Sequence, residues 1–124
     1  MPTVLIVEDD ADNRLLLKSL LEIWNYRVIE AGGGEALNLA REVLPDLILM
    51  DVKMPLLDGL ATTRDIRQSA RIESVPIIFI SGCAEARYRR AASEAGANDY
   101  FVKPVDFDKL QTAIAEHITS HRIL

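Results

Sequence analysis

Cysteine is nearly absent from this chain of 124 residues: Cys83 is the only one, so no disulfide can form within the chain. A fold without cross-links must be held by its own core, and 49% hydrophobic residues over this length are enough for one domain. The lack of disulfides is typical of a reducing compartment, so we expect a cytoplasmic protein.

Long apolar runs and surplus positive charge are also missing. Near the N-terminus, only four consecutive apolar residues precede the acids, too few for a signal peptide or a membrane span, so we expect no membrane insertion. The 14 Lys and Arg are outnumbered by 19 Asp and Glu, and the formal net charge is −5. This balance argues against direct binding to nucleic acid, which depends on surplus Lys and Arg. No linker, repeat or low-complexity tract divides the sequence, so we expect one domain over 1–124.

Short apolar runs alternate with longer amphipathic segments, which is the pattern of a (βα)5 fold. The apolar runs predict strands over 4–7, 27–31, 46–50, 76–80 and 100–102. The amphipathic segments predict helices over 15–24, 34–43, 58–70, 85–96 and 106–118. Short crossovers require parallel pairing with right-handed connections. We therefore predict an α/β fold, a doubly wound five-stranded parallel sheet in the flavodoxin-like order 2-1-3-4-5.

Polar residues follow most of these strands, at the edge where an open parallel sheet binds its ligands. The first and third strands are neighbours in the predicted order, so the acids behind them should meet in one pocket. A hydroxyl and an ammonium group should face them from the far side. The residues concerned are Glu8, Asp9 and Asp10 after the first strand, Asp51 after the third, Ser81 after the fourth, and Lys103 after the fifth.

Asp51 closes an otherwise apolar run, where an unpaired charge is costly unless something uses it. Neighbouring carboxylates repel one another, and either a shared proton or a hard cation must offset that repulsion. Mg²⁺ accepts a few oxygen ligands and keeps several waters, whereas no His or Cys is placed here to favour Zn²⁺. With Lys103 as a fixed positive charge, the pocket predicts a phosphoryl-transfer site in which Asp51 is the nucleophile.

Four stretches of the chain resemble the receiver domain of two-component response regulators, in particular the single-domain, chemotaxis-regulator-like members. These stretches are VLIVEDD, LILMDVKMPLLDG, FISG and DYFVKP. Their order and spacing match the family over nearly the whole chain. The resemblance implies that Asp51 is the phospho-acceptor, and that the donor is a sensor histidine kinase or a histidine phosphotransfer protein.

The resemblance also implies a metal site. Asp9 and Asp51 would bind Mg²⁺ together with the backbone carbonyl of Lys53, and Glu8 would reach the metal through water. Glu8 stands where Asp is more frequent in the family.

A second group of residues is implied to form the switch. Lys103 would pair with the phosphoryl group, and Ser81 would move toward it. Tyr100, the aromatic switch, would then turn inward into the space that Ser81 vacates. Pro104 matches a family proline that usually follows a cis peptide bond.

Three positions are implied to tune this switch. Gly82 stands where Ala is common, and its added backbone freedom would loosen the switch. Lys53 and Cys83 occupy positions that govern how water approaches the acyl phosphate, and hence the rate of dephosphorylation.

Several polar residues have a local interpretation. Asp10 and Asp58 are expected to cap the helices that follow them, because Asp is a favoured N-cap residue. The glycines at 32–34 match no phosphate-binding fingerprint and are expected to open the second helix. His117 and His121 have a spacing that could bind metal, but no third ligand is evident and they are expected at a solvated helix end. Arg87, Arg89 and Arg90 are expected on a solvated or partner-docking face.

We therefore expect a stand-alone response regulator, a phospho-accepting switch rather than an enzyme, that signals through protein contacts or a phosphorelay. The face formed by the helix over 85–96, the strand over 100–102 and the last helix should change on activation and carry partner binding or homodimerisation. One alternative is a receiver excised from a longer hybrid kinase or transcription factor. A phosphatase of the haloacid-dehalogenase type is another, although Lys53 stands where its second aspartate would be. A flavodoxin-type redox carrier would need a Ser/Thr-rich loop after the first strand, which is missing.

Overall fold

The computed structural model describes residues 1–53 and 56–123, and Met54 and Pro55 of the stretch LILMDVKMPLLDG lie outside this part. Its strands are β1 (Thr3–Val7), β2 (Arg27–Ala31), β3 (Leu47–Val52), β4 (Ile77–Ser81) and β5 (Asp99–Val102). Its helices are α1 (Ala11–Ile23), the short 3-10 helix η1 (Gly33–Glu35), α2 (Ala36–Val43), α3 (Leu57–Arg67), α4 (Ala86–Ala95) and α5 (Phe107–Ile123). Strands and helices therefore alternate along the chain, as the apolar pattern predicted.

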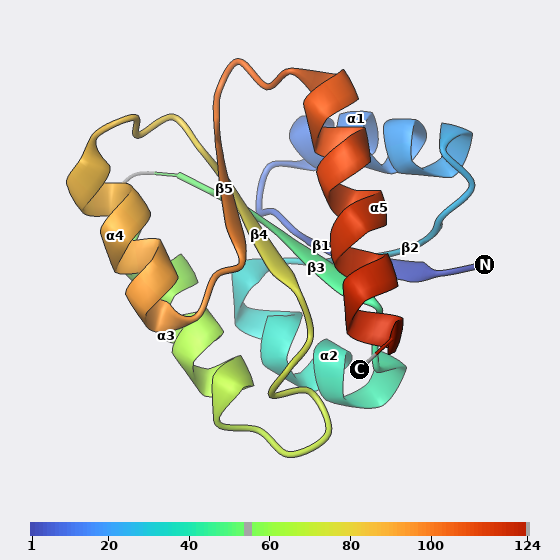
Figure 1. Cartoon of the computed structure of the whole chain (residues 1–124), viewed down its shortest axis with the longest axis horizontal. Coiled ribbons are helices and arrows are strands. Elements are labelled where there is room, and N and C mark those ends of the chain that lie inside the picture. Colours follow the sequence, from blue (N-terminus) through green and yellow to red (C-terminus); the bar gives the residue numbers. More distant parts are fainter. Residues whose placement is uncertain (54–55, 124) are drawn as a thin grey trace.

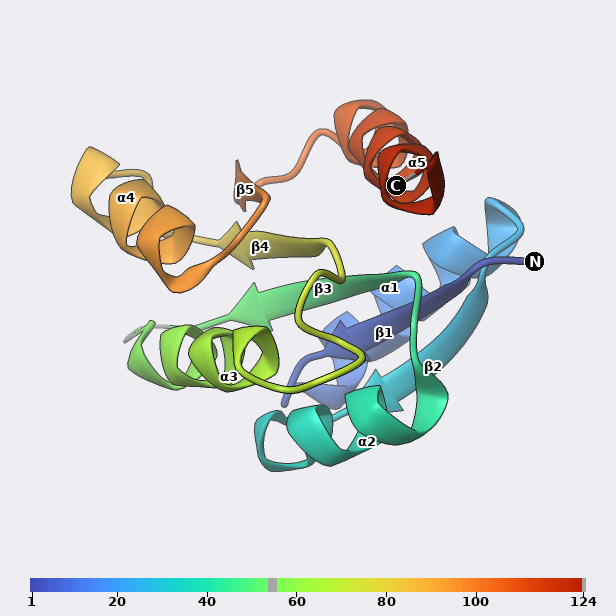
Figure 2. The same cartoon turned by 60° about the horizontal axis from the view of Figure 1, so that its bottom comes forward.

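The five strands form one parallel sheet in the order β2-β1-β3-β4-β5. This confirms the predicted fold class and strand order. Helices α1 and α5 cover one face of the sheet, and α2, α3 and α4 cover the other (Figures 1 and 2). The order reverses at β1, so the carboxyl ends of β1 and β3 lie side by side at the switch point.

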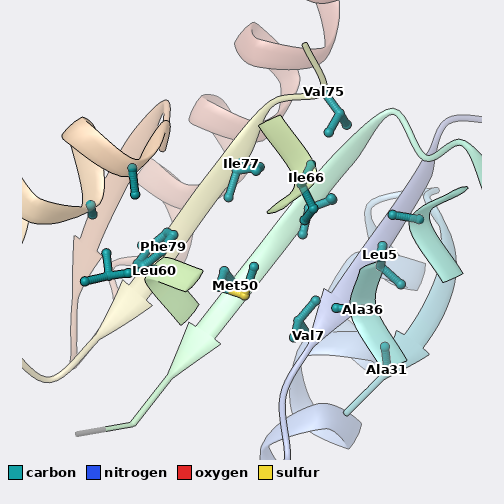
Figure 3. Packing of buried hydrophobic residues seen from close by; sticks show 14 of the residues in the cluster. Leu5, Val7, Ala31, Ala36, Met50, Leu60, Ile66, Val75, Ile77 and Phe79 are labelled. Atoms are coloured by element: carbon teal, nitrogen blue, oxygen red, sulfur yellow. The ribbon is translucent and has the colours of Figure 1, made fainter. Parts of the chain in front are cut away.

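The core consists of two apolar layers, one on each face of the sheet. Figure 3 shows the layer under α2 and α3, where Leu5, Met50 and Phe79 of the strands meet helix residues such as Ala36 and Leu60. The opposite layer is built from α1 and α5 against the other sides of the same strands. Because both faces are covered, β1 and β4 are buried at every position, which explains the continuous apolar runs over 4–7 and 77–80.

Strands β3 and β4 extend further than the apolar pattern indicated. The predicted strands ended before Asp51 and Ser81, but backbone pairing continues through both, with Asp51 opposite Ile80 and Val52 opposite Ser81. The two polar side chains are thus held by regular sheet rather than by loops. No helix in the described part of the chain is both long and apolar enough to cross a membrane.

Gly59 allows α3 to approach β3 closely. A Cβ atom at this position would lie 2.5 Å from Cγ1 of Val52, closer than packed atoms can come. The first turn of α3 therefore sits directly against the end of β3, beside Asp51.

Candidate functional site

Four carboxylates line one cavity of about 150 Å³, three of them at the carboxyl edge of β1 and β3 and the fourth on α3. Glu8 and Asp9 follow β1, and Asp51 belongs to the neighbouring strand β3. The structure therefore brings together three of the four acids that the strand order predicted to meet, whereas Asp10 does not line the cavity and caps α1 instead. The opposite wall comes from α3, through Asp58 and Thr62, which are one helical turn apart.

Asp51 is nearly buried, with 8% of its surface exposed, although it carries the carboxylate that we expect to react. The ammonium Nζ of Lys103, just past β5, lies 2.8 Å from Asp51 Oδ1. This ion pair does not have hydrogen-bond geometry, and within the described residues no group donates a hydrogen bond to that oxygen. The Lys103–Pro104 peptide bond is cis, as the resemblance implied. Asp51 thus presents a fixed oxygen beside a fixed positive charge.

Glu8 is the most deeply buried acid of the site, with 1% of its surface exposed. Its Oε1 accepts a hydrogen bond of 2.9 Å from the backbone N–H of Asp10, whereas its Oε2 has no partner among the described residues. Burial raises the pKa of Glu8 from 4.5 to about 7, against the opposing effect of the Asp10 N–H. The Asp51 carboxylate adds to the rise, and Lys103 counteracts it.

The raised pKa of Glu8 predicts a pH-dependent cost to stability in metal-free protein. The folded-state pKa of about 7 lies above the ordinary value of 4.5. The contribution of protonated Glu8 to the free energy of unfolding is therefore fully present below pH 4.5 and is lost as pH rises through 7. Glu8→Gln mimics the neutral acid, so its free energy of unfolding should exceed that of wild type by about 1 to 3 kcal/mol at pH 8. At pH 4 the difference should vanish. Urea unfolding with EDTA at pH 4 and pH 8 measures both free energies of unfolding. The same difference between variant and wild type at the two pH values would contradict the raised pKa of Glu8.

The turn between β1 and α1 is tied down at each acidic residue. Asp9 Oδ1 accepts a hydrogen bond of 2.8 Å from the N–H of Gly33. Asp10 caps α1 by accepting from the N–H groups of Asp12 and Asn13, which confirms its predicted role. Arg14 donates from Nη1 to the carbonyl oxygen of Glu8 at 3.1 Å, a contact that the sequence did not suggest.

Lys53 lies at the mouth of the cavity, where its exposed side chain approaches Asp10. The Nζ to Oδ2 distance is 3.6 Å, and both side chains are well exposed, so the pair contributes little to stability. The position is compatible with the tuning role that the resemblance implies, which stays a prediction.

Ser81 and Tyr100 both contact Cys83. Ser81 is fully buried at the end of β4, and its Oγ accepts a hydrogen bond of 3.0 Å from the Cys83 N–H. The Tyr100 hydroxyl, on β5, donates to the Cys83 carbonyl at 2.7 Å, so the ring already points inward. Cys83 itself is buried in the apolar layer, whereas Gly82 is exposed.

Two local predictions were wrong. Asp58 does not cap α3, because the helix begins at Leu57 and its N-cap position is Leu56, which places Asp58 inside the first turn. His117 is not at a solvated helix end, because its Nε2 lies 3.1 Å from Asp99 Oδ2 on β5. Glycines 32–34 lead into α2 as expected, through η1.

The arginines of α4 are exposed, as predicted, but two of them lie over aromatic rings. The guanidinium carbon of Arg87 is 4.9 Å from the ring centre of Tyr88, and that of Arg89 is 5.2 Å from the ring centre of Tyr100. Arg89 was considered only as part of a charged face, and no sequence spacing links it to Tyr100.

The donor set of the cavity fits a hard cation better than a soft one. Glu8 Oε2 is buried without a partner among the described residues, and Asp51 Oδ1, also buried, has only the Lys103 ammonium beside it, so the crowded carboxylates leave a need for further positive charge. Residues 1–53 and 56–123 contain no group of three His, Cys, Asp or Glu side chains already arranged around a metal position. A cation here would therefore rest on two carboxylates completed by backbone and water oxygens.

Comparison with known proteins agrees with this geometry. The family model for the response regulator receiver domain matches residues 4–115. Among curated proteins, the transcriptional regulatory protein ZraR of Klebsiella oxytoca is 36% identical over 97% of this chain, but this chain covers only 27% of ZraR. PilH of Pseudomonas aeruginosa is 34% identical over 92% of this chain and 95% of PilH.

One solved structure is similar over nearly the whole length of both chains. It is the receiver domain of the sensor histidine kinase PA1611 from Pseudomonas aeruginosa PAO1, which contains a magnesium ion coordinated in the active site cleft. It has 34% sequence identity and a TM-score of 0.85, and the match covers 95% of this chain and 98% of that one. With the family model matching nearly all of the chain, this protein belongs to the response regulator receiver domains of two-component systems.

Proposed function

We propose that this receiver domain accepts a phosphoryl group on Asp51 from a phosphohistidine of a sensor histidine kinase or a histidine phosphotransfer protein. The observation that carries the proposal is the Asp51 carboxylate, held in β3 with an oxygen that accepts no hydrogen bond, 2.8 Å from Lys103 Nζ. A nucleophile needs such a rigidly held carboxylate at the edge of a cavity, and the transferring group needs a nearby cation.

In the transfer, an Asp51 oxygen attacks the phosphorus of the phosphohistidine. The new P–O bond forms as the P–N bond breaks, and the electron pair of that bond returns to the imidazole of the donor. Lys103, already paired with Asp51, stabilises charge on the phosphoryl oxygens. The protein acts as a switch that assists its own phosphorylation and dephosphorylation, rather than as an enzyme acting on other substrates.

We propose Mg²⁺ as the cofactor. Asp9, Asp51 and the backbone carbonyl of Lys53 would hold it, and Glu8 would bind one of its waters. The buried Glu8 Oε2, which has no partner among the described residues, and the crowding of carboxylates around Asp51 support this assignment, as does the magnesium ion in the PA1611 receiver domain. When bound, the ion would neutralise the crowded carboxylates and the phosphoryl oxygens.

The metal assignment predicts that Asp9→Ala lowers Mg²⁺ affinity by about tenfold or more, because one of two carboxylate ligands is lost. The fold should persist, since the lost bond to Gly33 is offset by relief of charge crowding. Calorimetric titration with Mg²⁺ measures the affinity, and incubation with acetyl phosphate and Mg²⁺, with and without EDTA, tests phosphoryl uptake. Asp12→Ala, which removes an exposed acid of α1, is the matched control. Equal affinity in the Asp9 and Asp12 variants would exclude Asp9 as a ligand.

The output of the switch is proposed to be protein contact through the face formed by α4, β5 and α5, including activation-linked dimerisation or onward transfer in a phosphorelay. PilH, matched over 95% of its length, favours a stand-alone regulator consisting of one domain over 1–124. ZraR, of which this chain covers 27%, favours the alternative, in which this chain is the receiver domain of a longer regulator. The complete reading frame distinguishes the two.

A further inference from the structure

The loop between β2 and α2 lies beside the acidic turn because the sheet places it there. Strand β2 pairs with β1 in parallel, and the Glu8 N–H extends this pairing by donating to the carbonyl oxygen of Ala31 at 3.0 Å. The residues that follow the two strands therefore emerge at the same edge of the sheet. Gly33 lines the same cavity as Asp9. The loop over 32–34, which was expected only to lead into α2, thus contributes to the wall of the candidate site.

Among the three acids at this edge, Asp9 is the one that packing does not hold. Glu8 and Asp51 are buried, whereas Asp9 is exposed. An exposed carboxylate keeps its rotamer freedom unless a hydrogen bond restrains it. The Gly33 N–H donates to Asp9 Oδ1 at 2.8 Å and supplies this restraint. The orientation of the Asp9 carboxylate is therefore set by the backbone of the β2–α2 loop.

The backbone approaches Asp9 this closely because residue 32 has no side chain. A Cβ atom at Gly32 would lie 3.2 Å from Asp9 Oδ1 and 3.4 Å from Glu35 Oε1, and the first distance is tighter than most packed contacts. A Cβ atom at Gly34, two residues further on, would meet nothing within 4 Å. The two glycines therefore differ in what a methyl group would do to Asp9.

Glu35 holds the loop in its place. Its Oε1 accepts a hydrogen bond of 3.2 Å from the Gly32 N–H, and its own N–H donates to the Gly32 carbonyl at 3.1 Å. These reciprocal bonds close the turn that presents the Gly33 N–H to Asp9. Glu35 is exposed and does not line the cavity, so it acts on Asp9 through the loop.

We propose that the loop over 32–34 positions Asp9 for the cation: the Gly33 N–H holds the carboxylate in the orientation that receives Mg²⁺, and Glu35 holds the loop. This inference rests on the proposed function and adds positioning residues to the same site. A carboxylate that is oriented before the ion arrives loses less rotamer freedom on binding. Hydrogen bonds that orient a metal ligand in this way raise metal affinity, although the donor never touches the ion.

Gly32→Ala and Gly34→Ala form a matched pair, because each adds one methyl group and neither glycine has a positive φ. The methyl group at 32 pushes Asp9 Oδ1 away from the Gly33 N–H, whereas the one at 34 touches nothing. Calorimetric titration should therefore show Mg²⁺ affinity about three- to tenfold weaker in Gly32→Ala and unchanged in Gly34→Ala. In metal-free protein, the Gly33 amide should exchange about two- to fivefold faster in Gly32→Ala alone.

Glu35→Ala and Glu35→Gln test the loop without a change at the glycines. Both remove the same negative charge, but only Gln keeps a side-chain oxygen that can accept from the Gly32 N–H. Mg²⁺ affinity should therefore be about two- to fivefold weaker in Glu35→Ala than in Glu35→Gln. The side chain is exposed, so both variants should fold, and urea unfolding with EDTA should give the same midpoint for both.

The outcomes distinguish this inference from the function on which it rests. If wild type binds Mg²⁺ and Gly32→Ala binds it at least as tightly as Gly34→Ala, the loop does not position Asp9. Equal Mg²⁺ affinity in the two Glu35 variants would overturn the role of Glu35, and this pair decides the whole inference if Gly32→Ala does not fold. If wild type binds no Mg²⁺, the metal assignment of the proposed function fails, and this inference with it.

Discussion

Asp51→Asn should abolish phosphoryl uptake from acetyl phosphate while the protein remains folded. Asn has nearly the same volume as Asp, but its amide nitrogen cannot attack phosphorus, and its oxygen is a far weaker nucleophile than a carboxylate oxygen. The β3 backbone pairing does not depend on the charge, so the sheet should be unaffected. Intact-mass measurement in the presence of Mg²⁺ should show one added phosphoryl group in wild type and none in the variant.

A matched control separates this loss from a general effect of lost negative charge. Asp65→Asn removes an exposed carboxylate from α3, away from the cavity, and should accept the phosphoryl group as wild type does. Uptake by Asp51→Asn comparable to that of Asp65→Asn would show that the acceptor is another residue.

Arg67→Ala should cost about 2 to 4 kcal/mol in the free energy of unfolding. The Arg67 guanidinium bonds three backbone carbonyls and the Asn98 side chain, at distances of 2.7 to 3.0 Å. It thereby joins the end of α3 to the segment before β4 and to the turn between α4 and β5. Hydrogen bonds from a charged donor contribute more than neutral ones, and truncation leaves several acceptors without a partner. Denaturant unfolding measures the loss.

The control for Arg67 lies on the same helix. Arg64 is exposed, so Arg64→Ala should change stability by no more than about 0.5 kcal/mol. Arg67→Lys should fall between the two, because an ammonium group cannot reproduce the forked geometry of a guanidinium. A loss for Arg67→Ala no larger than that for Arg64→Ala would mean that these bonds exchange for water at little cost.

The fold was predictable because both sheet faces are covered by helices. Buried strands read as apolar runs and surface helices as amphipathic segments, and short crossovers leave few topologies open. The strand ends were less predictable. An apolar pattern stops at the first carboxylate or hydroxyl, but backbone pairing carried β3 past Asp51 and β4 to Ser81.

The meeting of Glu8, Asp9 and Asp51 also followed from the sequence, because adjacent parallel strands bring their carboxyl ends together. What could not be predicted are contacts that depend on side-chain direction between distant elements. The stacking of Arg89 on Tyr100 is one example, and the His117–Asp99 pair is another. Asp58 was misassigned because the N-cap of α3 is Leu56, a shift of two residues that no local signal reveals.

The identity of the phosphorylated residue tests the central claim most directly. After incubation with acetyl phosphate and Mg²⁺, borohydride reduces an aspartyl phosphate to homoserine, and peptide mass spectrometry locates the change. The account predicts homoserine at Asp51 alone. Homoserine at Asp9, Asp10 or Asp58, or phosphate retained on a hydroxyl such as Ser81, would contradict the account. Homoserine cannot arise from Glu8, whose side chain is one methylene group longer than that of Asp.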